Sequence, residues 1–114
     1  MRHFSAIPDF GKMGYEILAF SCVKFKMEQL MGIQEKAREW AKSHHCIIFT
    51  SRAQGMGMDA VTISLHKNYV EYAKFREKNK EIWGHLFEDM HFMLVDLKGE
   101  ITKPFSLKYL AEQQ

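Results

Sequence analysis

Residues 15–26 read YEILAFSCVKFK, and this stretch decides the fold. Aromatic and β-branched residues predominate in it, as they do in strands, and the run ends at charged residues just before Glu28. Three further runs of strand character follow along the chain: CIIFTS at 46–51, DAVTISLH at 59–66 and MHFMLVDL at 90–97. We therefore predict four strands, of which the first is unusually long.

Two segments between these strands have helical periodicity. In residues 27–43 the apolar side chains recur at spacings of three and four, which predicts a helix with one buried side. We expect the second helix to begin at Asn68, because Asn68 and Glu71 have the spacing of a capping box, and to end or kink near Gly84. The polar, glycine-bearing residues 52–58 predict a hairpin with a long connection.

The order of these elements favours a ferredoxin-like β-α-β-β-α-β sandwich of the α+β class. Its four-stranded antiparallel sheet carries two helices on one face, with the strands in the spatial order 4-1-3-2. We expect one domain over residues 15–100, after a lead-in or linker remnant at 1–14 and before a C-terminal tail at 101–114 that ends in helical turns. The third strand would separate Cys22 from Cys46, so no disulfide is expected between them.

Length and composition place the chain among ordinary globular domains. It has 114 residues, of which 46% are hydrophobic and 26% charged. A run of about 20 apolar residues is absent, and so is a signal-peptide stretch at the N-terminus, so we expect a cytoplasmic location and no membrane partner. The net charge of +2, with Lys and Arg interspersed with Glu, argues against nucleic-acid binding by this chain alone.

The predicted sheet has apolar side chains on both faces. An isolated two-layer domain would alternate apolar and polar residues, because its open face meets water. We therefore predict self-association into a homodimer or a higher oligomer. The candidate interface residues are Leu18, Phe20, Cys22, Phe92 and Leu94.

A second explanation of the two-faced sheet is that the ends of the chain fold back over its open face. Apolar residues that would serve this purpose occur in the lead-in and in the tail: Phe4, Ile7, Phe10, Phe105 and Leu110. This explanation requires no partner chain.

Residues 14–26 (GYEILAFSCVKFK), residues 55–75 (GMGMDAVTISLHKNYVEYAKF) and the closing strand resemble one known domain. It is the C-terminal effector domain, or RAM domain, of Lrp/AsnC-type transcriptional regulators, particularly archaeal members, and the resemblance spans roughly residues 7–100. In that family a helix-turn-helix domain comes first, and residues 7–13 (IPDFGKM) resemble the end of the linker that follows it. The resemblance implies a non-enzymatic, stand-alone or excised effector-binding and oligomerising domain, with identical chains, full-length Lrp/AsnC relatives and an amino acid or similar small molecule as its partners.

The family's effector pocket lies where dimers meet and uses a hairpin with a Gly-x-x-Asp pattern. Asp59 matches the aspartate, whereas Met56 replaces the glycine and has Gly55 and Gly57 on either side. The resemblance implies effector binding by Gly55, Met56, Gly57, Met58 and Asp59. Amide groups exposed beside glycines, together with one carboxylate, suit the charged ends of an amino acid. A turn that only connects two strands is the other interpretation of the same residues.

Small dimeric α/β-barrel enzymes of monooxygenase type are the alternative function, since two such sheets can close around an apolar cavity. His66, His85 or His91 would supply the acid-base group, although a lone histidine is more often structural. His44, His45 and Cys46 do not predict a metal site, because neighbouring strand residues point to opposite faces. We expect no catalytic residue, no metal and no cofactor.

Overall fold

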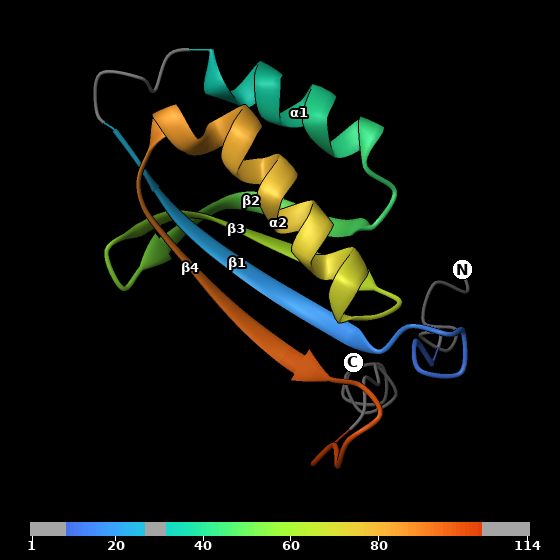
Figure 1. Ribbon diagram of the computed structural model, residues 1–114. Helices are drawn as coiled ribbons and strands as arrows, with labels where there is room; N and C mark the ends of the chain where they lie inside the picture. Colours follow the sequence, from blue (N-terminus) through green and yellow to red (C-terminus); the bar gives the residue numbers. More distant parts are fainter. Residues whose placement is uncertain (1–8, 27–31, 104–114) are drawn as a thin grey trace, which may run out of the picture.

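The computed structural model of the chain describes residues 9–26 and 32–103. Its elements are β1 (Ile17–Phe25), α1 (Ile33–Ser43), β2 (Ile47–Gly55), β3 (Met58–His66), α2 (Tyr69–Trp83), the 3-10 turn η2 (Gly84–Leu86) and β4 (Phe87–Asp96). The strands form one antiparallel sheet in the order β2-β3-β1-β4, and both helices lie on one side of it (Figure 1). The predicted ferredoxin-like fold and its strand order are confirmed.

Some boundaries differ from those expected. α1 begins at Ile33, because Gly32 has a φ of 79°, which a right-handed helix excludes. A helix running unbroken through residues 27–43 is therefore wrong, and residues 27–31 themselves lie outside the described residues. Residues 1–8 and the tail at 104–114 also lie outside them, and with these Phe4, Ile7, Phe105 and Leu110. β4 begins at Phe87, earlier than the run at 90–97 indicated.

The two ends of α2 are set by local interactions that the sequence predicted. Asn68 precedes the helix, and its side-chain Oδ1 accepts a hydrogen bond from the backbone N–H of Glu71 at 2.9 Å. At the other end Gly84 follows Trp83 and opens the 3-10 turn that leads into β4. Within the described residues, no helix is long and apolar enough to cross a membrane.

One part of the core joins α2 to the end of β3. The imidazole of His66 contacts the rings of Tyr72 and Phe75, with centroids 5.5 and 4.9 Å apart. Its Nε2 lies 2.8 Å from the hydroxyl of Ser64, which is fully buried in the same strand. His66 is therefore a structural core residue, which packs against two rings of α2 and forms a hydrogen bond within β3.

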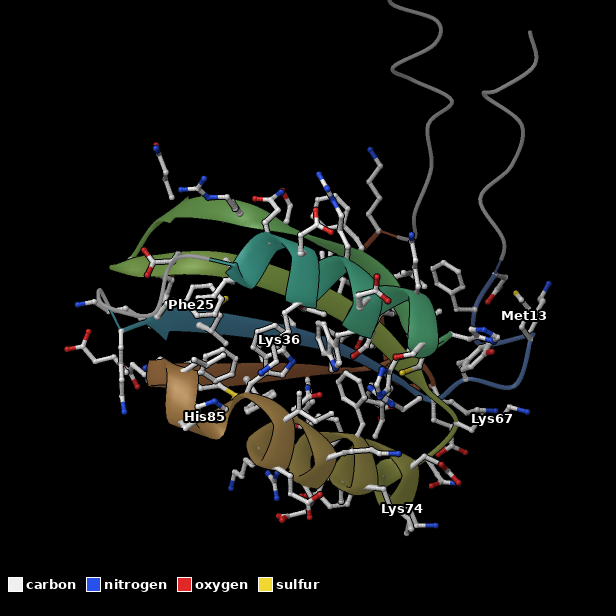
Figure 2. All side chains as sticks on the ribbon, turned by 90° about the horizontal axis from the view of Figure 1, so that it is seen from above. Met13, Phe25, Lys36, Lys67, Lys74 and His85 are labelled. Atoms are coloured by element: carbon white, nitrogen blue, oxygen red, sulfur yellow. The ribbon has the colours of Figure 1, made fainter. Side chains whose placement is uncertain are left out.

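A second part of the core joins α1, α2 and β4. The ring of Trp83 stacks on that of Phe87 with centroids 5.9 Å apart, and Ile33 of α1 packs in the same cluster. Lys36 extends from α1 towards α2 (Figure 2), where its Nζ donates to the carbonyl of Ile82 at 3.2 Å. These contacts hold α1 to α2 and to the start of β4, and a cavity lies between α1 and the strands β2 and β3.

Both cysteines are free thiols, and β3 lies between β1, which contains Cys22, and β2, which begins directly after Cys46, as the predicted topology requires. Burial raises the pKa of the Cys46 thiol. That thiol stays protonated at neutral pH and behaves as a small apolar side chain.

His66 makes the stability of the fold depend on pH. Desolvation lowers the pKa of its imidazole below the ordinary value of 6.5, although the carboxylate of Glu71 acts in the opposite direction. The unfolded chain therefore binds a proton at a pH where the folded chain does not. Above pH 6.5 the imidazole is neutral in both states and does not lower the free energy of unfolding. As the pH falls from 6.5 to the lowered pKa of the folded state, the free energy of unfolding decreases.

Replacing His66 should flatten this dependence. We expect the Tm of the wild type to fall more steeply than that of His66→Gln when the pH is lowered from about 7.5 to about 5. Glutamine is chosen because its amide can still bond the Ser64 hydroxyl. Calorimetric scans would measure both, with the exposed His85 changed to Gln as the control. Parallel curves for wild type and His66→Gln would contradict the prediction.

Candidate functional site

β2 and β3 are joined by a tight hairpin rather than by a long connection. Gly55 at the end of β2 pairs with Met58 at the start of β3, so the turn consists of Met56 and Gly57. Their φ angles are 53° and 72°, the positive values of a type I′ turn, whose twist matches that of the strands. The long connection predicted at 52–58 is wrong because the polar residues at its start continue β2.

The turn separates the candidate effector-binding residues into two groups. Met56 forms the tip and is 86% exposed. Four others line a cavity of about 1370 Å³ between α1 and the sheet, namely Gly55, Gly57, Met58 and Asp59. The structure thus brings these four to one wall of a cavity and leaves Met56 outside it.

Asp59 ties the hairpin to the end of β1. Its Oδ2 accepts a hydrogen bond from the backbone N–H of Phe25 at 3.0 Å. The last backbone pair between β1 and β3 is Val23 with Ala60, so the Asp59 carboxylate extends the connection beyond that pair. One carboxylate oxygen of Asp59 therefore has a structural role.

The sheet face that turns away from the helices is apolar, as predicted. Phe20 on β1 pairs with Ile63 on β3 and with Met93 on β4, and directly opposed residues share a face. Met93 is 67% exposed, and Phe49, which pairs with Ile63, is 51% exposed. Leu18 and Leu65 at one end of this face are buried within the single chain. We call this surface the open face.

Two of the candidate interface residues do not belong to the open face. Phe92 and Leu94 pair with Ser21 and Ala19, which point towards the helices, and the Phe92 ring contacts Tyr72 of α2 with centroids 6.0 Å apart. Grouping Phe92 and Leu94 with Leu18, Phe20 and Cys22 is therefore wrong. The strand run at 90–97 did not reveal its register against β1. The positions on the open face that were expected for Phe92 and Leu94 are occupied by Met93 and Val95, which pair with Phe20 and Leu18.

The candidate histidines are dispersed. His85 is exposed in the 3-10 turn, and His91 lies 3.0 Å from the Asp89 carboxylate on the surface, where this hydrogen bond lowers the pKa of Asp89. Among the described residues that line the cavity there is no histidine. In residues 9–26 and 32–103 no group of three or more His, Cys, Asp and Glu is placed to hold a metal ion.

Sequence reasoning missed the polar residues in the cavity. Asn79 of α2 and Ser21 of β1 both line it, and both are 5% exposed. A signal for each exists in the sequence. Asn79 interrupts the helical series of Tyr72, Phe75 and Trp83, and Ser21 interrupts an apolar strand. A polar residue at a position where the period demands an apolar one marks an interior polar site.

Three solved structures share the fold of this chain. An AsnC family transcriptional regulator from Agrobacterium tumefaciens matches with a TM-score of 0.63 and 13% identity, over 92% of this chain and 66% of that one. The protein PH0061 matches with a TM-score of 0.65 and 17% identity, over 90% and 64%. The transcriptional regulator NMB0573 from Neisseria meningitidis, in complex with L-Met, matches with a TM-score of 0.66 and 14% identity, over 96% and 69%.

The fold is that of AsnC-type regulators. The chain spans about two thirds of the length of these proteins. No protein-family model matches its sequence, and no curated protein sequence matches it significantly. At these identities the likeness establishes the AsnC-type fold.

The hairpin geometry can be tested at Gly57. Because its φ is 72°, Gly57→Ala should lower the free energy of unfolding by about 1 kcal/mol, the cost of a left-handed conformation for a residue with a Cβ. Gly84→Ala is the matched control, since Gly84 has a φ of −52° and open space around an added Cβ. Urea unfolding followed by circular dichroism would measure both variants. Equal losses at the two glycines would refute the turn assignment.

Proposed function

We propose that this chain is an effector-binding and oligomerising domain of an Lrp/AsnC-type transcriptional regulator, either stand-alone or excised from a longer protein, and that it works in the cytoplasm. The observation that carries the proposal is the AsnC-type fold combined with an apolar open face. The chain covers about two thirds of the length of the two matched regulators, which fits a domain that acts beside a separate DNA-binding part. Its macromolecular partners are identical chains and full-length relatives.

Self-association follows from what the open face presents. Phe20, Ile63 and Met93 form an apolar row across three strands, and Phe49 extends it at the edge. An apolar patch of this kind is uncommon on a stable monomer and is buried by a partner. A second copy offers the same surface, and two identical faces can bury each other around a two-fold axis.

The candidate effector is an amino acid held at the β2–β3 hairpin. The matched regulator NMB0573 forms a complex with L-Met, which supports an amino acid as the ligand class. In this chain the hairpin supplies the Asp59 carboxylate for an ammonium group and backbone amides at a glycine-bearing turn for a carboxylate. These residues are close enough together in sequence and space to meet both ends of one small molecule.

A non-enzymatic role is the better supported one. Two of the matched structures are transcriptional regulators, and the three candidate histidines lie in different surroundings. The monooxygenase-type alternative would place a histidine in the cavity, and the described lining residues contain none. We therefore assign binding and assembly, rather than catalysis, to this domain.

The open face can be tested with substitutions that leave the fold intact. Met93→Glu and Phe49→Glu place a charge on side chains that are 67% and 51% exposed, so they should dissociate the oligomer without unfolding the chain. Val70→Glu on α2, at a side chain that is 61% exposed, is the matched control. Sedimentation velocity would report the masses. An unchanged mass for Met93→Glu would remove the open face as the interface.

The effector can be sought by thermal shift against the twenty amino acids. A ligand that binds only the folded state should add about 2.7 kcal/mol at 100 times its Kd and raise the Tm by several degrees. Asp59→Asn should reduce this response, since the amide oxygen can still accept from Phe25 but carries no charge. Glu77→Gln on the exposed side of α2 should leave it unchanged. If no amino acid raises the Tm, the domain is an assembly module.

A further inference from the structure

The cavity between α1 and the sheet has aromatic walls. The side chains of Phe25, Trp40, Trp83 and Phe87 all line it. Trp83 lies at the centre of this group, with ring centroids 5.6 Å from Trp40 and 6.4 Å from Phe25. A volume of about 1370 Å³ is more than sufficient for a molecule with one or two rings.

Buried polar atoms without a partner are concentrated at this cavity. In the described part of the chain, five side-chain atoms are buried and make no hydrogen bond: Ser21 Oγ, Trp40 Nε1, Arg76 Nε, Asn79 Oδ1 and Trp83 Nε1. All but the Arg76 atom belong to residues that line the cavity. Ser21 and Asn79 are 5% exposed and Trp83 is 3% exposed, so bulk solvent does not replace the missing partners.

Such a concentration needs an explanation. Each unmade hydrogen bond of a buried group costs about 1–3 kcal/mol, and buried polar groups in native proteins are nearly always paired. The residues that carry these atoms come from β1, α1 and α2, three elements that are distant in sequence, and they line one cavity. Two indole N–H donors, one hydroxyl and one amide oxygen together match a ligand group that both accepts and donates hydrogen bonds.

The rim of the cavity adds positive charge. Four cationic side chains and one acidic side chain line it: Lys24, Arg38, Lys42, Arg52 and Asp59. Lys24 and Arg38 form ion pairs with Glu88 and Glu35. Lys42 and Arg52 make no ion pair within the described residues, and both are exposed to solvent. The rim therefore favours an anionic group on a ligand whose body lies among the aromatic rings.

We propose that this cavity binds a small aromatic carboxylate that carries a polar ring substituent. The ring packs among the aromatic walls, the substituent bonds Asn79 and the indole N–H groups, and the carboxylate faces Arg52 and Lys42. The proposal deepens the proposed effector function and rests on it in one respect, because the hairpin that includes Asp59 forms part of this wall. It differs in requiring one protomer only.

The protein contains its own reporter for this site. Its sequence has two tryptophans, Trp40 and Trp83, and both line the cavity. Titration with para-hydroxyphenylpropanoate, excited at the red edge of indole absorption, should change their fluorescence saturably. Phenylpropanoate, which lacks the hydroxyl, should bind roughly tenfold more weakly, because the buried polar atoms then stay unpaired. The neutral para-hydroxyphenylpropanamide should also bind more weakly, because it lacks the charge.

Variants separate the parts of the site. Asn79→Leu should weaken the hydroxylated acid roughly tenfold and leave phenylpropanoate unchanged, whereas Arg52→Gln should weaken both acids to the same extent. Lys74→Gln is the control, since Lys74 lies on the outer side of α2 (Figure 2) and should alter neither. The absence of saturable binding by every probe would overturn the proposal. An equal effect of Asn79→Leu on both acids would overturn it as well.

Two further measurements keep the result independent of ligand choice and of assembly. Without ligand, Asn79→Leu should leave the Tm unchanged or raise it, because it removes an unpaired buried polar group. A lower Tm would show that Asn79 is bonded in the free protein, by ordered water for example, and would overturn the proposal. Met93→Glu should retain aromatic-acid binding even as a monomer, and a loss there would refute a site within one protomer. If Met93→Glu loses only its thermal-shift response to amino acids, amino-acid binding requires the oligomer, and the aromatic-acid site within one protomer is retained.

Discussion

β1 is the strand on which the rest of the molecule depends. Over Ile17–Val23 it pairs on one side with β3 and on the other with β4, so its backbone groups are bonded in both directions. A central strand satisfied in this way tolerates apolar side chains on both of its faces. Those two faces then serve different purposes, since one meets the helices and the other forms the open face.

The alternation along β1 brings the two candidate surfaces close together without merging them. Ser21 lines the cavity on the helix side, while its neighbours Phe20 and Cys22 belong to the open face. The sheet therefore separates the proposed ligand site from the proposed assembly surface by the thickness of one strand. Near the end of β1, the Asp59 hydrogen bond to Phe25 links the hairpin to the same strand. The cavity, the hairpin and the open face are thus all connected through β1.

The position of α1 explains why a cavity exists at all. α1 is held by the Ile33 cluster, which includes Trp83 of α2 and Phe87 of β4, and by the Lys36 bond to Ile82 of α2. β2 and β3 extend past the covered part of the sheet to the Met56–Gly57 turn. The space between them is walled by aromatic rings from four elements, β1, α1, α2 and β4, and by the inner side of the hairpin. In this chain the AsnC-type fold therefore has a cavity on the helix side of the sheet in addition to the apolar open face.

The sequence by itself determined the elements and their order. The strand runs, the Asn68 cap and the Gly84 end depend on neighbours along the chain, whose interactions are fixed by spacing alone. The strand order followed from the connections. Only the tertiary structure decided the register of β4, which moved Phe92 and Leu94 to the helix side, and the docking of α1, which created the cavity around Asn79. These features depend on contacts between residues far apart in sequence, where a shift of one residue reverses every side chain of a strand.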